Sequence, residues 1–106
     1  MTTSYYAIYA IDKPGLAALR EALREPHRQY IRAPHADAVE TVLGGPLLDD
    51  QGRMNGTLLV VRAATREAAE RFLAADPYSL AGLFERVELR AWRWGLGEPA
   101  AAGTAR

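Results

Sequence analysis

The chain has 106 residues, of which 49% are hydrophobic and 25% are charged, and its thirteen basic residues balance thirteen acidic ones. This length and composition predict one globular domain over residues 1–95, followed by a flexible tail over residues 96–106 that offers little to pack. The absence of net charge disfavours binding to nucleic acid or to an anionic membrane surface.

The lack of cysteine excludes a disulfide framework and fits a reducing cytoplasm, and two histidines without cysteine make a metal site improbable. No segment approaches the roughly 18 uninterrupted apolar residues of a membrane span, and the N-terminus lacks the basic and apolar regions of an export signal. We therefore expect a cytoplasmic protein that does not act at a membrane.

The first half of the chain predicts a strand, a helix and another strand. Residues 5–11 are aromatic and aliphatic at every position, as expected for a strand that is covered on both faces. Leucines then recur at helical spacing after residue 15, but Pro26 should kink this helix or start a second segment over residues 26–33. Residues 39–43 predict a second strand, which is expected to end in a turn at Gly44-Gly45-Pro46.

The second half predicts a strand, a helix, a short helical turn and a final strand. Residues 57–61 form a solid apolar run, and Thr65 is a good N-cap for a helix that runs to about Ala75. A short turn follows Pro77, and residues 87–94 alternate with the period of a strand.

The resulting order, βαββαβ, fits an α+β ferredoxin-like sandwich with a four-stranded antiparallel sheet in which the first and third strands are central. Two helices cover only one face of such a sheet, yet both central strands are apolar on both faces. We therefore expect a homodimer in which two chains pack sheet against sheet.

His27 and Asp76 are the candidate acid-base residues. If the helix continues through Pro26, His27 points inward with the apolar stripe, and it is then either a half-buried histidine bonded locally or a general acid or base. Asp76 precedes Pro77, so its simplest role is to cap the short helical turn. A capping carboxylate keeps a second oxygen that can orient an imidazole and leave its other nitrogen free for proton transfer.

Other features of the sequence give weaker functional signals than this pair. Arginines recur every fourth residue from Arg20 to Arg32, which suits a phosphate-binding stripe, but neighbouring glutamates make a solvated surface the favoured interpretation. Residues 57–61 lack the aromatic side chains of a sheet that binds RNA. Three tyrosines are candidates for the lining of a substrate pocket: Tyr9, Tyr30 and Tyr78.

With these segments in place, the chain resembles the YCII family of small proteins over about residues 5–95. The matching motifs, in order, are Tyr6-Ala7-Ile8-Tyr9-Ala10, Asp12-Lys13-Pro14-Gly15, Pro26-His27, Gly44-Gly45-Pro46-Leu47-Leu48, Ala74-Ala75-Asp76-Pro77-Tyr78 and residues 87–94. The resemblance implies a dimeric α+β barrel, and it implies that the family's His-Asp pair falls on His27 and Asp76 in a pocket between helices and sheet. It also implies lyase-like chemistry, such as halide elimination from hydroxylated aromatic compounds, which is associated with some relatives.

The leading functional prediction is a small lyase or isomerase that uses no cofactor and no metal. His27 moves a proton on a small metabolite, with aromatic compounds among the candidates, and Asp76 orients the imidazole. The alternative is a dimeric module that binds a small molecule, or assists a partner enzyme, without turning anything over.

Overall fold

The computed structural model describes residues 4–98, so most of the predicted tail lies outside the described residues. These residues form four strands and three helices, which in chain order are β1 (Ser4–Asp12), α1 (Ala17–Arg32), β2 (Glu40–Leu48), β3 (Met54–Ala63), α2 (Arg66–Ala74), α3 (Pro77–Leu80) and β4 (Phe84–Trp92). The predicted order of elements is thus confirmed, and β4 covers residues 84–92 instead of 87–94.

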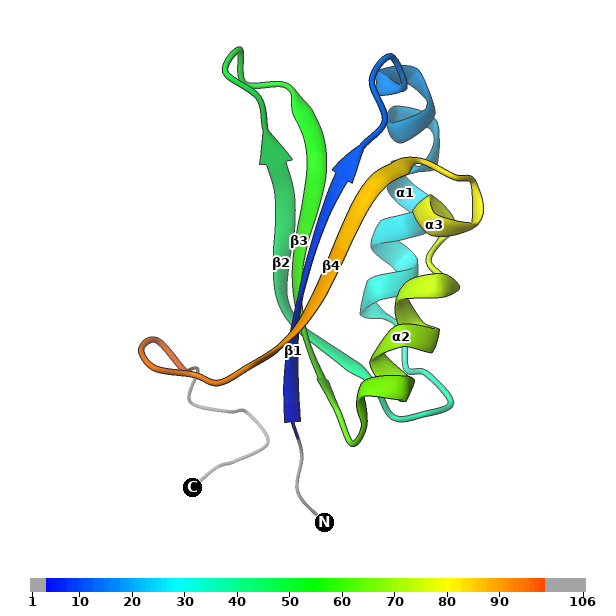
Figure 1. Cartoon of the computed structure of the whole chain (residues 1–106). Coiled ribbons are helices and arrows are strands. Elements are labelled where there is room, and N and C mark those ends of the chain that lie inside the picture. The colour runs from blue at the N-terminus through cyan, green and yellow to red at the C-terminus, as the bar shows by residue number, and fades with distance from the viewer. Residues whose placement is uncertain (1–3, 99–106) are drawn as a thin grey trace.

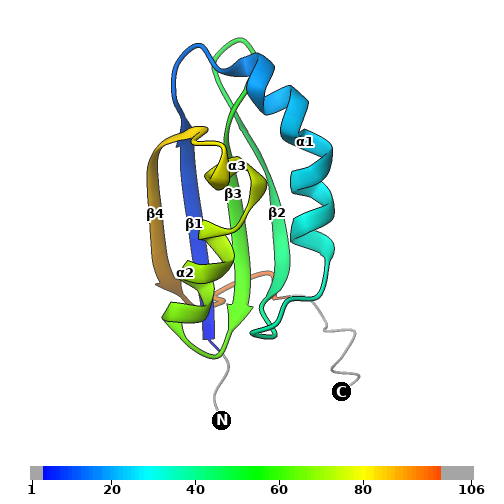
Figure 2. The same cartoon turned by 90° about the vertical axis from the view of Figure 1, so that its right-hand side faces the viewer.

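The strands form one antiparallel sheet in the order β2-β3-β1-β4, with β1 and β3 at its centre as predicted. All three helices lie on the same face of this sheet, and the opposite face has no helix over it (Figures 1 and 2). The architecture is the α+β ferredoxin-like sandwich that the sequence predicted.

Alternation along the central strands divides their side chains between the two faces. Ile8 and its cross-strand partner Leu59 are buried beneath the helices, with exposures of 1% and 2%. The next pair, Tyr9 and Leu58, points to the open face and is 41% and 37% exposed. The open face therefore carries large apolar side chains in a position that the helices of this chain cannot cover.

The prediction that Pro26 breaks the first helix is wrong, because α1 runs without interruption from Ala17 to Arg32. Proline removes one backbone N–H donor, which would have bonded to the carbonyl four residues earlier, at Ala22. Both Pro26 and Ala22 are exposed, so water can satisfy that carbonyl. The buried side of α1 includes Arg20 and His27, one on each side of the proline, and its packing holds the helix together.

The predicted turn at Gly44-Gly45-Pro46 is also wrong, because these residues continue β2 and pair with Leu59, Leu58 and Thr57. A proline is tolerated here because β2 is an edge strand. Gly44 approaches its neighbour so closely that a Cβ atom would collide with the side chain of Leu59. Gly44 thus permits close strand pairing here, and the segment does not reverse the chain.

Side-chain caps begin the two helices that follow β3. Thr65 Oγ1 accepts a hydrogen bond of 3.1 Å from the backbone N–H of Ala68 at the start of α2. Asp76 caps α3, and Pro77 occupies its first turn, where no N–H is needed. Gly82 follows α3 with a φ of 74°, a left-handed conformation that suits glycine. These local signals fix where α2 and α3 begin and where α3 ends, and tertiary packing then brings α3 against α1.

Within residues 4–98, no helix combines the length and the apolar character that a membrane crossing requires.

Candidate active site

His27 and Asp76 come together although 49 residues separate them in the sequence. His27 projects from the buried side of α1 and is 7% exposed, while Asp76 begins α3 and is 1% exposed. The Nδ1 atom of His27 lies 2.9 Å from Oδ2 and 3.0 Å from Oδ1 of Asp76. The contact is direct and buried, and it joins a residue of α1 to the N-cap of α3.

Hydrogen bonds to the backbone hold Asp76 in place independently of its contact with the imidazole. Its Oδ1 atom accepts a hydrogen bond of 2.8 Å from the backbone N–H of Tyr78, as an N-cap does, and its own backbone N–H donates to the carbonyl of Leu73 at 3.2 Å. Its backbone carbonyl accepts from the N–H of Leu80 at 2.9 Å. One carboxylate therefore caps a helix and orients a histidine, as the sequence allowed.

This contact determines which nitrogen of the ring can act. An ionised carboxylate only accepts hydrogen bonds, so Nδ1 of His27 carries the proton and donates to Asp76. In a neutral ring, Nε2 then has a free lone pair, and it makes no hydrogen bond to any of residues 4–98. The arrangement can accept a proton at Nε2 and stabilise the resulting imidazolium through Asp76.

Tyr78 supports the ring from the side. The tyrosine and imidazole rings stack with centroids 4.1 Å apart and an angle of 17° between their planes. Tyr78 is 1% exposed, and this burial raises the pKa of its phenol above 10.0, with the nearby Arg20 guanidinium opposing the rise. The phenol stays neutral at physiological pH and forms a fixed wall beside His27.

Arg20 contacts side chains from three other elements near His27. Its Nε atom donates to Oδ2 of Asp12 at 2.6 Å, and its Nη2 atom donates to Oδ1 of Asp12 at 2.9 Å and to Oγ1 of Thr57 at 2.8 Å. Its Cζ atom also lies 4.5 Å from the centre of the Tyr78 ring. One buried guanidinium thus joins α1 to β1, β3 and α3, and it fixes the wall against which His27 stacks.

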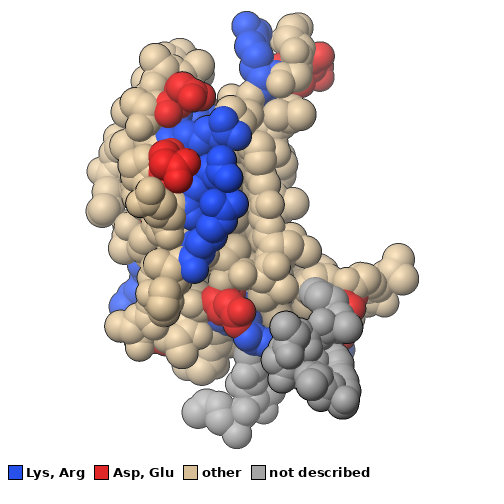
Figure 3. All heavy atoms as spheres, turned by 180° about the vertical axis from the view of Figure 1, so that it is seen from behind, with Lys and Arg blue, Asp and Glu red and all other residues tan. Residues whose placement is uncertain are grey.

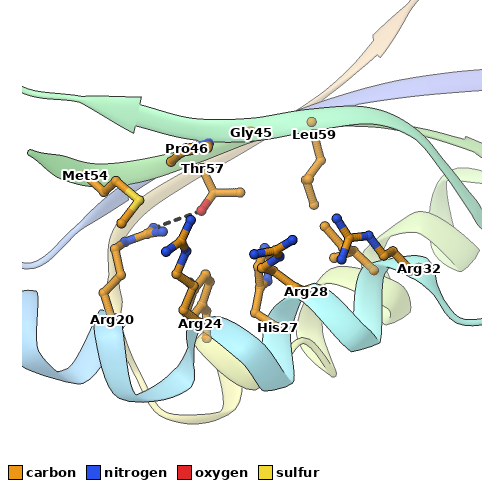
Figure 4. A pocket seen from close by; sticks show the side chains of 13 residues that line it. Arg20, Arg24, His27, Arg28, Arg32, Gly45, Pro46, Met54, Thr57 and Leu59 are labelled. Carbon is orange, nitrogen blue, oxygen red and sulfur yellow. Dashed lines mark hydrogen bonds between the residues drawn. The ribbon is translucent and has the colours of Figure 1, made fainter. Parts of the chain in front are cut away.

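A cavity of about 250 Å³ opens beside His27, between α1 and the neighbouring strands β2 and β3 (Figure 4). An apolar cavity of about 150 Å³ is enough to hold benzene, so this space accommodates a small ring with substituents. Six residues of α1 line one side, and seven residues from the strands and α3 line the rest: Arg20, Arg24, His27, Arg28, Ile31, Arg32, Gly44, Gly45, Pro46, Met54, Thr57, Leu59 and Tyr78.

The three tyrosines predicted to line a pocket lie in different places. Tyr78 lines the cavity, but Tyr9 does not, because its position in β1 sends it to the open face of the sheet. Tyr30 does not line it either, since its hydroxyl donates to the carbonyl of Phe72 at 2.7 Å and its ring packs on Phe72. Burial, and secondarily the charge of Asp76, raise the pKa of Tyr30.

Sequence reasoning missed the role of the arginines. The sequence favours a solvated surface for the repeat from Arg20 to Arg32, and Arg24 and Arg32 are indeed exposed. Arg20, however, is only 3% exposed, and all four arginines line the cavity. Their spacing of four residues matches that of a helix face, and His27 follows Arg24 by three. This shared spacing is the sequence feature that could have placed the arginines beside His27. The neighbouring glutamates favour a solvated surface instead and hide that feature.

Within residues 4–98, no three His, Cys, Asp or Glu side chains gather closely enough to hold a metal ion. The ionisable groups at this site include the imidazole of His27, the carboxylate of Asp76 that contacts it, and the guanidinium groups that line the cavity.

Comparison with known proteins identifies the family. The profile of the YCII-related domain matches residues 4–93, which is most of the chain. The chain belongs to the YCII family. Curated relatives in this family include the protein YciI of Escherichia coli, which is 29% identical over 83% of this chain and 95% of its own length. An uncharacterised protein of Haemophilus influenzae is 28% identical over 84% of this chain and 96% of its own length.

Among solved structures, this YCII chain is similar to 5-chloro-2-hydroxyhydroquinone dehydrochlorinase (TftG) from Burkholderia phenoliruptrix, determined in complex with 2,5-dihydroxybenzoquinone. The two share 28% sequence identity and a TM-score of 0.74, and the match covers 86% of this chain and 95% of the other. A putative antibiotic biosynthesis monooxygenase from Bacteroides thetaiotaomicron has a TM-score of 0.55 at 16% identity, which is a similarity of fold alone.

Proposed function

We propose that this YCII-family protein is a small enzyme of lyase or isomerase type, in which His27 transfers a proton and Asp76 orients the ring. The observation that carries the proposal is the contact of 2.9 Å between Nδ1 of His27 and Asp76 at the edge of a cavity. The transfer is balanced by protein side chains and needs no cofactor. The cysteine-free sequence fits the reducing cytoplasm, where we propose that the enzyme works.

The geometry gives His27 the properties of a general base. The hydrogen bond to Asp76 fixes the tautomer and leaves the Nε2 lone pair available, and the stacked ring of Tyr78 restricts rotation of the imidazole. A positioned base or acid of this kind contributes about 10²- to 10⁴-fold to a rate. The carboxylate of Asp76 lies beside the imidazole, where it balances the positive charge that His27 gains.

The reaction that fits this machinery is an elimination or a tautomeric shift. Nε2 removes a proton from the substrate, and the electron pair of the broken bond forms a new double bond. In an elimination, a leaving group departs with its own electron pair as an anion, and the proton on His27 then passes to solvent. TftG, whose name describes it as a dehydrochlorinase of a hydroxylated aromatic compound, supports a substrate of this kind.

The test is chloride release from 5-chloro-2-hydroxyhydroquinone and related hydroxylated chloroaromatics, compared for the wild type and H27N. We expect the variant to lose about 10²- to 10⁴-fold in kcat while it still binds 2,5-dihydroxybenzoquinone. Asparagine can donate to Asp76 in place of the imidazole, so the variant should remain folded, which its melting curve verifies.

Equal turnover by H27N and the wild type would refute the proposal. A wild type that binds the quinone without any turnover, together with an H27A variant that loses affinity, would instead establish the alternative of a binding module.

We also propose that the open face of the sheet is the interface of a homodimer. Two cross-strand pairs, Tyr9 with Leu58 and Ala7 with Val60, place apolar side chains side by side on this face. Leu43 of β2 pairs with Val60 on its other side and adds a third side chain to that pair. Four strands of about nine residues present a face of roughly 30 by 19 Å, or about 570 Å² in projection, compared with about 800 Å² per partner in a standard interface.

Light scattering coupled to size-exclusion chromatography tests this contact at micromolar concentration. The wild type should show twice the chain mass of 11.6 kDa, and L58E should reduce the mass to that of one chain, since a carboxylate buried at the interface has no partner. L80E is the matched control, because Leu80 is 73% exposed on α3, on the helical side of the sheet. A wild type that elutes as a monomer would contradict the proposal.

A further inference from the structure

The wall of the cavity formed by α1 is positively charged along its length. Arg24, Arg28 and Arg32 are spaced by four residues and line the cavity together, which spreads three guanidinium groups over about 12 Å along the helix axis. Figure 3 shows Lys and Arg side chains gathered in one band on the side of the molecule where α1 and β2 lie. His27 lies between Arg24 and Arg32 along this wall (Figure 4).

The protein does not neutralise this charge with its own carboxylates. Arg20 is balanced by Asp12, and His27 is paired with Asp76. By contrast, within residues 4–98 no carboxylate lies within 4.0 Å of the guanidinium groups of Arg24, Arg28 or Arg32. Like charges four residues apart on a helix repel one another, so the unliganded protein carries a cost that an anion would remove.

The opposite wall differs in chemistry. Met54 and Leu59 supply apolar surface, and Gly44, Gly45 and Pro46 complete this wall without a polar side chain. The hydroxyl of Thr57 already accepts a hydrogen bond from Arg20. A ligand in this cavity would thus place an apolar body against the strands and its charged groups against α1.

We propose that the cavity binds a small substrate that carries at least two anionic oxygens, supplied by two carboxylates, by one phosphate or by two acidic hydroxyl groups, and held by Arg24, Arg28 and Arg32. Guanidinium groups match such oxyanions because their N–H donors form a planar fork. A volume of about 250 Å³ admits one substituted ring, so its anionic oxygens reach different arginines while the ring stays beside His27. This inference rests on the proposed function only in taking the cavity as the substrate site.

Calorimetric titration at low salt tests the inference with three probes that share a benzene ring: isophthalate, phenyl phosphate and the neutral benzamide. We expect isophthalate or phenyl phosphate to bind, benzamide not to bind, and affinity to fall as sodium chloride rises. Whichever anion binds more tightly distinguishes carboxylate from phosphate chemistry. R28Q and R32Q should each weaken the binding of that anion by about tenfold or more, because each removes a charged donor.

R71Q is the matched control, since Arg71 is an exposed arginine on α2 that pairs with Asp37 outside the cavity. It should bind the anion as the wild type does. Melting temperatures separate binding from folding: unliganded R28Q and R32Q should be at least as stable as the wild type, because repulsion along α1 falls, yet lose the stabilisation by the anion.

Benzamide binding as tight as that of the anions, unchanged affinity in R28Q and R32Q, or no binding of either anion would overturn the inference. These measurements involve no turnover, so their outcome is independent of the H27N experiment. Anion binding without a reaction at His27 would support this inference and refute the proposed function. A reaction at His27 without anion binding would do the opposite.

Discussion

Replacing Asp76 by asparagine is expected to leave the protein folded and to lower the rate of the His27-dependent reaction by about 10³- to 10⁴-fold. The amide oxygen of asparagine can still cap α3 by accepting from Tyr78, because asparagine is as good an N-cap as aspartate. The amide nitrogen, however, donates to Nδ1 of His27. The ring must then carry its proton on Nε2, which removes the lone pair that accepts the substrate proton.

D76A separates the two roles of this carboxylate. Alanine leaves the N–H of Tyr78 and Nδ1 of His27 without their acceptor, so we expect the free energy of unfolding to fall by about 2–4 kcal/mol, against about 1 kcal/mol for D76N. Denaturant unfolding measures this difference, and ¹⁵N chemical shifts of the imidazole report the tautomer. D76N with wild-type turnover, or with the proton of His27 still on Nδ1, would show that Asp76 does not orient the ring.

Most of the architecture could be predicted from the sequence because its signals are local and repeat. The strand residues 5–11 and 58–61 are all aromatic or aliphatic, and the caps at Thr65 and Asp76 act on N–H groups two or three residues away. Such patterns identify elements and their order, and chirality rules then leave few topologies. The ferredoxin-like sandwich follows from these rules without any long-range information.

The errors arose where tertiary contacts outweigh local preference. Pro26 disfavours a helix, yet packing on both sides of it keeps α1 continuous, with its freed carbonyl turned to solvent. Gly44-Gly45-Pro46 is a typical turn sequence, but pairing with β3 keeps it extended as an edge strand. In both cases the unfavourable residue destabilises its helix or strand only slightly. The backbone group that is left without a protein partner can form a hydrogen bond with water.

The site itself was only partly accessible to sequence reasoning. His27 and Asp76 could be named as candidates, but their contact depends on how α3 packs against α1, which no local pattern encodes. The same holds for the bond between Arg20 and Asp12, whose partners are eight residues apart on different elements. The arginine repeat was visible, but a helix face presents the same pattern to solvent or to a cavity.

Replacing Arg20 by methionine is expected to lower the free energy of unfolding by about 3–5 kcal/mol, the usual effect of removing one partner of a buried ion pair. The side chains of Arg20 and Asp12 are only 4% and 7% exposed, so the carboxylate would stay buried without its cation. Thr57 would also lose its donor. Domains of this size are stable by only about 5–15 kcal/mol, so the loss is a large fraction of the total.

A second substitution distinguishes loss of charge balance from simple loss of packing. Adding D12N to R20M removes the unpaired charge while it keeps the shape of the side chain, so the double variant should recover part of the lost stability even though D12N alone is destabilising. Urea unfolding at one fixed protein concentration measures all four proteins, since any dimerisation would make stability depend on concentration. An R20M variant as stable as the wild type, or a D12N/R20M variant less stable than R20M, would contradict the role of Arg20 as the residue that joins α1 to the sheet and positions Tyr78 beside His27.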